Sequence, residues 1–386
     1  MKKINLFEAF SWIWSQHRAL ENIWFDVNSV WISDWYVSAI IAYGVEYLNI
    51  LPILPVFKNK NQEKKYKEGL KNKLLKYSLS NDSKKPAKNL NIPLEQLSIL
   101  EQVIEKFWKL DIRDIKWKDL IDKNIDLFTY SFPCQDISQQ WKRVGFSKWE
   151  KSRSWLLWEI ERILQEMKNI DPTKLPKVLM MENVKAILNE QFKPDLDWWI
   201  KELWRLWYET TLPFKVNSSD VWSPQNRTRV FMVSKLKSNI KLEPFPEQKV
   251  NKKSILWDIL QKVENREKLD KSKYSWYKEL ISKNENTVKK AILEWYTTFR
   301  SENYIYYKDW LAPTITASWA QSRIKFFWEN WDIYFLNSEE HLLLQGFSKS
   351  FYQKLKKLDY WEAKIKFLAW NSINVKVLEK IFNFYL

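Results

Sequence analysis

Glycine is almost missing from this sequence: its 386 residues include four glycines but 25 tryptophans. Glycine normally makes up about 7% of residues and supplies the positive φ angles of tight turns, so a large protein with four glycines is hard to build. The two counts together come close to the usual share of glycine alone. We hypothesise that many of the tryptophans are misdecoded glycines, from UGA codons that some bacteria read as glycine. The alternative is a protein that is truly rich in tryptophan.

Cysteine and histidine are also scarce. Cys134 is the only cysteine, which excludes an intrachain disulfide, and with His17 and His341 as the only histidines a Cys/His zinc site is disfavoured. No metal site is expected, both histidines are expected to be structural or at the surface, and any thiol chemistry must use Cys134.

Long hydrophobic runs are absent as well. The longest, residues 47–57, contains two prolines and is too short to span a bilayer. The apolar N-terminus is interrupted by Glu8, so no signal peptide is expected. The sequence therefore predicts a soluble, cytoplasmic protein with no membrane partner.

Positive charge is in excess, with 63 Lys and Arg against 47 Asp and Glu and a net charge of +16. Such a surface suits a polyanion such as nucleic acid, because lysine and arginine gain affinity by releasing counterions from phosphates. Lysine enrichment from AT-rich codons, which only keeps the protein soluble, is the alternative. A length above about 300 residues predicts one large and one smaller domain.

Alternating strands and helices dominate the first 235 residues. A short strand at 6–10 runs through a tight turn into a helix at about 15–22, and a second strand at 29–33 ends at Asp34. An acidic residue about 20 positions past such a turn can hold a ribose hydroxyl, so the segment indicates a nucleotide cofactor. An ordinary βαβ unit is the alternative.

Two candidate catalytic residues follow later strands. Cys134 comes after a strand at 126–131, and Glu182 lies at the end of a strand beginning at Val178. Open α/β sheets place their chemistry at the carboxyl ends of strands, so the thiol and the carboxylate are expected to lie close together. A helix is expected at 156–168, a strand at 229–234 and a final strand–helix pair at about 368–384.

These residues resemble the DNA (cytosine-5) methyltransferase family, most closely its bacterial and mollicute CpG-type members. Seven motifs carry the resemblance over most of the chain, in the family's order and approximate spacing: Phe10-Ser11-Trp12-Ile13-Trp14, Ser33-Asp34-Trp35, Asp111-Ile112, Ser131-Phe132-Pro133-Cys134-Gln135, Met181-Glu182-Asn183-Val184-Lys185, Gln225-Asn226-Arg227-Thr228-Arg229 and Trp370-Asn371-Ser372.

The departures from the family pattern concern tryptophan and one carboxylate. Asp34 replaces the more usual Glu, whereas Trp35 and Trp158 stand where tryptophan is expected. The family usually has glycine or another small residue at positions 12, 14, 155, 222, 319 and 370, all of which are tryptophan here. Taken literally, Trp12 and Trp14 would fill the space that the cofactor needs.

The resemblance implies a Rossmann-like α/β methyltransferase domain with a mixed, mostly parallel sheet, plus a smaller target-recognition domain. The catalytic domain is expected at 1–235, with a lysine-rich surface insertion at 58–90. The target-recognition domain is expected at 236–345, and the segment 346–386 is expected to return to the catalytic domain.

The chemistry that the resemblance implies is methyl transfer from S-adenosylmethionine to carbon 5 of a cytosine flipped out of duplex DNA. Cys134 would attack carbon 6 to form a covalent adduct, Glu182 would bind ring nitrogen 3, and Arg229 with Arg227 would steady the ring oxygen and the loop. The expected cofactor contacts are Phe10, Trp12, Ile13, Trp14, Asp34, Trp35, Asp111, Ile112, Pro133, Leu156, Asn371 and Ser372. The expected DNA contacts are Gln135, Ser138, Arg143, Arg153, Gln225, Gln321 and Arg323.

Other readings stay open at this point. The protein is a catalytically silent DNA-binding protein if Trp12 and Trp14 are genuine, or an RNA cytosine-5 methyltransferase on the same scaffold. Its expected partner is double-stranded DNA, joined by a cognate restriction endonuclease if it is the modification half of a restriction-modification system rather than an orphan or phage enzyme, and it is expected to be a monomer. CpG is the expected target only by resemblance.

Overall fold

The computed structural model describes residues 1–10, 12–133, 156–237, 242–248, 250, 253–260, 266–280, 288–298, 300–315 and 323–386. The chain forms two compact units. The first comprises Met1–Lys215, Arg229–Pro246 and Phe382–Leu386, and the second comprises Val216–Thr228 and Glu247–Ile381.

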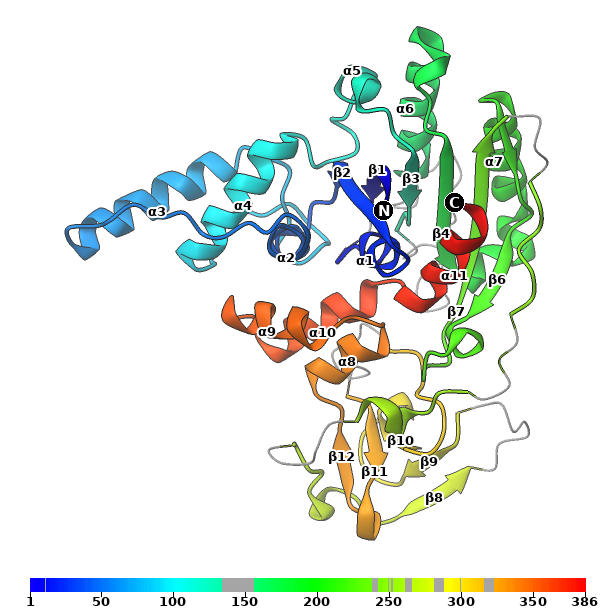
Figure 1. Ribbon diagram of the computed structural model, residues 1–386. Helices are drawn as coiled ribbons and strands as arrows, with labels where there is room; N and C mark the ends of the chain where they lie inside the picture. Colours follow the sequence, from blue (N-terminus) through cyan, green and yellow to red (C-terminus); the bar gives the residue numbers. More distant parts are fainter. Residues whose placement is uncertain are drawn as a thin grey trace. The chain divides into compact units, whose positions relative to one another are not determined.

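A seven-stranded mixed sheet forms the centre of the first unit (Figure 1). Its first four strands are parallel neighbours, whereas β7 runs antiparallel to β4 and to β5. This arrangement confirms the predicted α/β class with a mixed sheet. The strand order is β2-β1-β3-β4-β7-β5, with β6 paired to β7; the strands are β1 (Lys2–Ala9), β2 (Phe25–Ser33), β3 (Leu127–Tyr130), β4 (Val178–Val184), β5 (Tyr208–Thr210), β6 (Phe214–Asn217) and β7 (Thr228–Leu236).

Helix α6 packs on this sheet because it turns an apolar stripe toward it. In α6 the buried residues Leu157, Ile160, Leu164 and Met167 recur at helical spacing and join Phe128 of β3 in one hydrophobic core. Helices α2, α3 and α4 gather beside β2 at the sheet edge (Figure 1). The helices of this unit are α1 (Ser15–Asn22), α2 (Val37–Tyr47), α3 (Lys60–Leu74), α4 (Leu94–Phe107), α5 (Trp117–Leu120), α6 (Leu157–Ile170) and α7 (Lys193–Arg205).

The parallel register brings four strand ends to one edge of the sheet. Ala9 at the end of β1 pairs with Ser33 of β2 and with Tyr130 of β3, and Tyr130 pairs with Met181 of β4. The segments that follow these residues carry the predicted cofactor turn, Asp34, the approach to Cys134, and the Glu182-Asn183 pair. This edge is where an open α/β sheet binds ligands.

The second unit is built on a five-stranded sheet, ordered β12-β11-β10-β9-β8. Its strands pair antiparallel except for β10 with β11, and a small core including Leu293, Ile305 and Phe335 lies against them. The strands are β8 (Tyr277–Leu280), β9 (Lys290–Leu293), β10 (Tyr304–Tyr307), β11 (Lys325–Phe327) and β12 (Ile333–Phe335), followed by α8 (Ser338–Leu344), α9 (Lys349–Lys357), α10 (Glu362–Asn371) and α11 (Val375–Tyr385).

Two expectations about the C-terminal segment need correction. The final segment forms two helices, α10 and α11, rather than a strand and a helix, because a short apolar run alone does not distinguish the two. Of the segment 346–386, residues Phe382–Leu386 belong to the first unit and the remainder to the second. The strand with Glu182 at its end is β4, which antiparallel pairing with β7 extends to Val184, as expected. The expected insertion contains α3, a largely exposed basic helix.

Candidate active site and cofactor turn

The turn after β1 joins strand and helix as expected. The N–H of Phe10 donates to the carbonyl of Ser33 at 2.8 Å, which holds the end of β1 against β2. Phe10, Trp12 and Trp14 all have positive φ, at 59°, 54° and 50°. Trp14 is the residue immediately before α1. A turn with this backbone favours glycine, because a Cβ crowds the neighbouring carbonyl in the left-handed region.

Asp34 ties the turn to the end of β2. One carboxylate oxygen accepts the N–H of Tyr36 at 2.8 Å, and the other accepts the N–H of Trp12 at 3.3 Å. Burial outweighs these hydrogen bonds and raises the pKa of Asp34 to about 6. The carboxylate therefore lies next to the turn, where a ribose hydroxyl is expected in this type of fold.

The two indoles of the turn do not fit a nucleotide cofactor. The ring of Trp12 packs on that of Tyr36 at 5.2 Å between centroids, and the backbone N–H groups of both residues bind the Asp34 carboxylate. The Trp14 side chain is fully buried against Tyr43, and its Nε1 has no hydrogen-bond partner among the described residues. Asp34 suits the expected ligand, whereas Trp12 and Trp14 do not.

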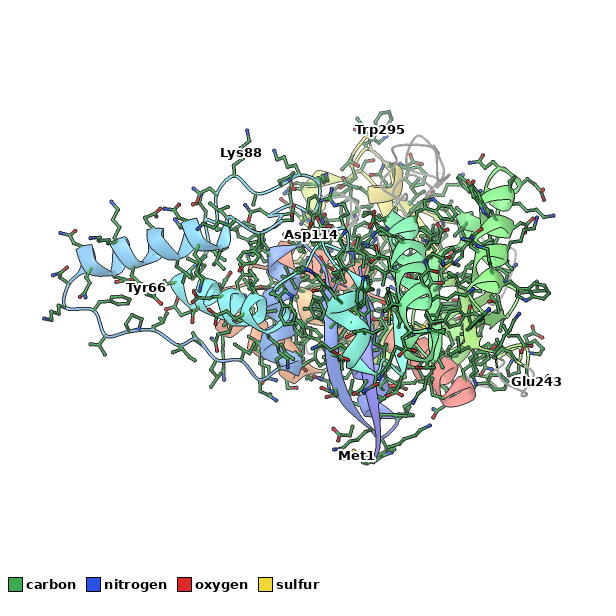
Figure 2. The ribbon with its side chains drawn as sticks, turned by 90° about the horizontal axis from the view of Figure 1, so that it is seen from above. Met1, Tyr66, Lys88, Asp114, Glu243 and Trp295 are labelled. Carbon is green, nitrogen blue, oxygen red and sulfur yellow. The ribbon has the colours of Figure 1, made fainter. Side chains whose placement is uncertain are left out.

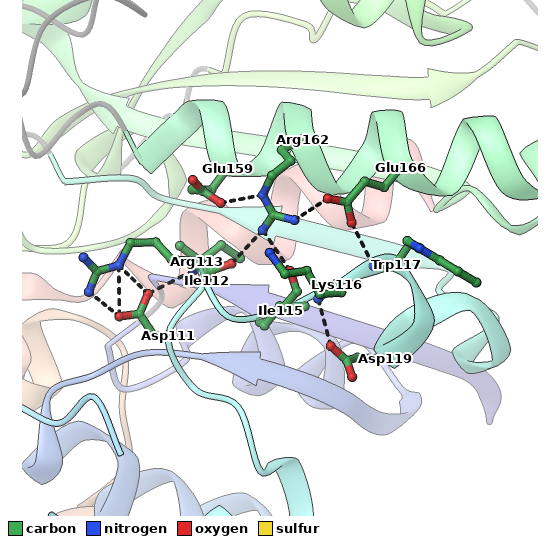
Figure 3. A network of polar contacts seen from close by, with 10 residues as sticks. All are labelled: Asp111, Ile112, Arg113, Ile115, Lys116, Trp117, Asp119, Glu159, Arg162 and Glu166. Atoms are coloured by element: carbon green, nitrogen blue, oxygen red, sulfur yellow. Dashed lines mark hydrogen bonds and ion pairs between the residues drawn. The ribbon is translucent and has the colours of Figure 1, made fainter. Parts of the chain in front are cut away.

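The segment with Asp111 and Ile112 is held by arginines (Figure 3). The Arg113 Nε binds both oxygens of Asp111, at 2.9 and 3.1 Å, so the guanidinium already occupies this carboxylate. Arg162 of α6 donates to the carbonyls of Ile112 and Ile115 at 3.2 and 2.8 Å. The same guanidinium pairs with two carboxylates of its own helix, Glu159 and Glu166, both at 2.7 Å.

This segment is also tied to the end of β2. The hydroxyl of Ser33 donates to the carbonyl of Leu110 at 2.8 Å. Three segments predicted to contact the cofactor, the turn, Asp34 and residues 110–112, are therefore joined by hydrogen bonds at one sheet edge.

An ion pair between Glu182 and Arg229 joins the central strands β4 and β7 at the same edge, where β4 ends and β7 begins. Val184 of β4 pairs with Arg229 of β7, and Glu182 pairs with Phe231, so Glu182 and Arg229 are diagonal neighbours on one face. Arg229 Nε lies 3.2 Å from Glu182 Oε1, and the side chains are 17% and 9% exposed. A carboxylate and a guanidinium that are mostly shielded from water are suited to bind a polar ring.

Asn183 connects this pair to the segment before Cys134. Its Nδ2 donates to the carbonyl of Phe132 at 3.1 Å, and its Oδ1 accepts the N–H of Val184 at 2.8 Å. Cys134 follows two residues after Phe132 and lies outside the described residues. Gln135, Ser138, Arg143 and Arg153 lie outside them too, as does Gln321.

The remaining residues expected to bind cofactor in the first unit differ in exposure. Ile13 is buried in the core, whereas Trp35, Pro133 and Leu156 are half-buried.

Several predicted site residues belong to the second unit and have packing roles there. Arg227 is buried and donates to the carbonyls of Ile315, Trp370 and Ser372 at 3.3, 3.0 and 3.1 Å. These contacts hold segments of the second unit together, and the catalytic role that the motif suggested for Arg227 stays a prediction.

The other predicted site residues of this unit differ in burial and in hydrogen-bond partners. Gln225 is fully buried with its Oε1 3.4 Å from Gln345 Nε2, and its DNA contact stays a prediction. Asn371 and Ser372 donate to carbonyls of α10. Arg323 is 43% exposed, pairs with Glu267 and lies over Phe335. Among these residues, Arg323 keeps the exposure that a DNA contact requires.

Sequence reasoning gave no structural role to Arg162, Arg113 or the buried Glu8. The spacing of Arg162 from Glu159 and Glu166, three and four residues apart on one helix, signals an ion-pair cluster. Glu8 interrupts an apolar strand and is fully buried, and burial raises its pKa well above the usual range. A carboxyl group inside such a strand was a visible signal.

A model of the family described as C-5 cytosine-specific DNA methylase matches residues 67–384. The chain belongs to this family. It is 36% identical to the orphan methyltransferase M.SssI of Spiroplasma monobiae, over 98% of this chain and 96% of the relative. It is 32% identical to the type II methyltransferase M2.ScrFI of Lactococcus lactis subsp. cremoris, over 61% and 62% of the two chains.

Solved structures share the fold at much lower identity. The Dnmt2 methyltransferase of S. pombe superposes with a TM-score of 0.59 at 17% identity, covering 99% of this chain and 97% of that one. The methyltransferase EhMeth of Entamoeba histolytica gives 0.61 at 14%, covering 100% and 98%.

The protein is thus a DNA (cytosine-5) methyltransferase, and S-adenosylmethionine is the methyl donor of its family. Restriction-modification methyltransferases are among its relatives. Within the described residues, no helix is long and apolar enough to cross a membrane. The same residues hold no group of three or more His, Cys, Asp or Glu arranged to bind a metal ion.

Proposed function

We propose that Glu182 and Arg229 bind the flipped cytosine and that Cys134 is the nucleophile. The observation that carries this proposal is the shielded ion pair at the sheet edge, joined through Asn183 to the segment that leads to Cys134. A base-binding pair next to the nucleophile's own strand is the arrangement that covalent attack on a ring requires.

The proposed step uses these side chains in a fixed order. The Cys134 thiolate forms a bond to carbon 6, the electron pair of the double bond between carbons 5 and 6 shifts to join carbons 4 and 5, and ring nitrogen 3 takes up a proton from solvent water. The Glu182 carboxylate accepts a hydrogen bond from that proton, and Arg229 holds Glu182 in place beside the ring oxygen. Carbon 5 of the resulting enamine is nucleophilic, and reversal of the step expels the thiolate and restores cytosine.

Residues outside this step have positioning roles. Asn183 keeps the approach to Cys134 in register with β4, and Arg227 holds the second unit together. We assign target recognition to the second unit, where Arg323 is exposed and Lys289 and Lys290 lie over the rings of Tyr307 and Tyr304. Lysine and arginine near aromatic rings suit phosphate and base contacts.

The cellular setting completes the proposal. We place the protein in the cytoplasm as a monomer acting on double-stranded DNA, with a restriction endonuclease of matching specificity as a genetic partner. CpG remains the predicted target.

Hydrogen exchange at carbon 5 tests the catalytic assignment without cofactor. In the enamine, carbon 5 takes a proton from water and releases the isotope that it carried, so DNA with tritium at carbon 5 of cytosine loses label. Cys134→Ser should abolish the release, and Glu182→Gln should slow it about 100-fold or more. The matched control Glu190→Gln changes an exposed carboxylate and should leave the rate unchanged. Unaltered release by Cys134→Ser would refute the proposed nucleophile.

One observation favours a second candidate, a catalytically silent DNA-binding protein. The indoles of Trp12 and Trp14 at the turn would exclude the cofactor. Calorimetry with S-adenosylmethionine on the protein purified from its native host separates the two: binding supports the methyltransferase, and DNA binding without cofactor binding supports the silent protein.

A further inference from the structure

Tryptophan in this protein has an unusual backbone distribution. Among the residues that the structure describes, 14 non-glycine residues have positive φ, and eight of them are tryptophan. Four of the other six are Asn or Asp, whose short polar side chains tolerate this region. A bulky aromatic residue at positive φ is a genuine outlier, so eight of them indicate a common cause.

Three of the eight follow helix ends. Trp24 (φ 69°), Trp108 (φ 39°) and Trp207 (φ 70°) come directly after the last turns of α1, α4 and α7. Each N–H donates back into its helix, for example Trp108 to the carbonyl of Ile104. A left-handed residue with this hydrogen bond is the glycine position of a helix C-terminus.

Another lies in a hairpin turn. Asn330 and Trp331 have φ of 53° and 58° and connect the antiparallel strands β11 and β12. Two successive positive φ angles define a type I′ turn, whose preferred pair is Asn-Gly. The pair in this sequence is Asn-Trp, so the preferred asparagine is present and the preferred glycine is replaced by tryptophan.

Most of the side chains at these positions are also exposed to solvent. Six of the eight indoles are between 44% and 86% exposed, and Trp295, the most exposed, projects from the ribbon (Figure 2). Trp14 is buried with an unpaired Nε1, as described above.

Trp158 and Trp199 form the contrast. They lie within α6 and α7, are 4% and 0% exposed, and contact each other edge to face. Trp199 Nε1 donates to Tyr130 Oη at 3.2 Å. Glycine at either position would weaken a helix and leave a cavity.

We infer that glycine occupies positions 12, 14, 24, 108, 207, 222, 295 and 331 of the working protein, and that glycine at 12 and 14 opens the turn beside Asp34 to the cofactor. The backbone argument for the eight positions is independent of the proposed function. The consequence for the turn rests on that function. With glycine at 12, the N–H that binds Asp34 remains and the indole over Tyr36 is gone.

Peptide mass spectrometry of the protein from its native host tests the assignment. The tryptic peptide Ile4–Arg18 carries positions 12 and 14, and the peptide Leu206–Lys215 carries position 207. We expect glycine at all three, with UGA codons at the eight positions and UGG codons at 158 and 199. Tryptophan at 12 and 14 would overturn the inference. Glycine at 158 or 199 would overturn the rule that backbone conformation separates the two classes.

Cofactor binding tests the consequence. Two recombinant proteins are compared by calorimetry with S-adenosylmethionine: the chain as printed, and the chain with Trp12→Gly and Trp14→Gly. We expect the double variant to bind about 100-fold more tightly or better. A matched control with Trp24→Gly and Trp295→Gly, away from the turn, should not restore binding. If the native peptides contain glycine but the double variant does not bind, the assignment stands and the proposed cofactor turn is wrong.

Discussion

Replacing exposed left-handed tryptophans with glycine should stabilise the protein. Trp24 and Trp295 have φ of 69° and 60° and are 76% and 86% exposed, so little packing is lost with their indoles. Relief of left-handed strain contributes about 1–2 kcal/mol per site. The greater freedom of glycine in the unfolded chain opposes this by about 0.4–1 kcal/mol. The net gain is about 0.5–1 kcal/mol per site, or about 1–2 kcal/mol for the double variant.

Replacing tryptophan with glycine at a helical site should instead lower the free energy of unfolding. Trp204 is 64% exposed but lies in α7, where Lys237 Nζ is 5.0 Å from its ring. Trp204→Gly loses that contact and helix propensity, so we expect a loss of about 1 kcal/mol. Urea unfolding followed by circular dichroism measures all three proteins. The reasoning is refuted if Trp24→Gly and Trp295→Gly destabilise the chain as Trp204→Gly does.

Two further predictions concern Asp34 and Asn183. Burial raises the pKa of Asp34 to about 6 from a usual 3.8, so the folded state binds the proton of this carboxyl group more tightly than the unfolded state does. The stabilisation from this proton is therefore full below about pH 4 and is lost as the pH rises through 6. Asp34→Asn should remove that dependence, so the difference in unfolding free energy between variant and parent should change between pH 4 and 7; a constant difference would contradict the shift. Asn183→Ala removes the hydrogen bond to Phe132, and we expect kcat to fall about 10-fold or more with little change in KM for DNA. Steady-state kinetics measure this, and a rise in KM alone would argue against a positioning role.

Local patterns predicted several elements because the relevant forces act within a few residues. The strand–turn–helix around Trp12, the helix at 157–170 and the strands before Cys134 and Glu182 follow from hydrophobic period and turn residues. The final segment was misjudged for the same reason: α10 and the start of α11 contain short apolar runs that fit either a strand or a helix, and packing decided between them.

The site residues, too, were predicted only in part from the sequence. The motif around Arg227 and Arg229 placed both arginines near the chemistry, yet residues two positions apart point to the same face only when both lie in one strand. Arg229 lies in β7 and faces Glu182, whereas Arg227 precedes the strand and binds three carbonyls of the second unit. No spacing in the sequence could separate these two roles.

The sequence by itself determined the family, the methyl-transfer chemistry and the suspicion about tryptophan, because motif residues and composition are properties of the chain alone. The tertiary structure decided which strands are neighbours, and so which carboxylate meets which arginine. It also added suspect tryptophans, by their positive φ, to those that the family pattern marks at positions 12, 14 and 222. A φ angle depends on the turn or helix end in which a residue sits, and that conformation separates Trp24 and Trp331 from Trp158 and Trp199 where the residue name cannot.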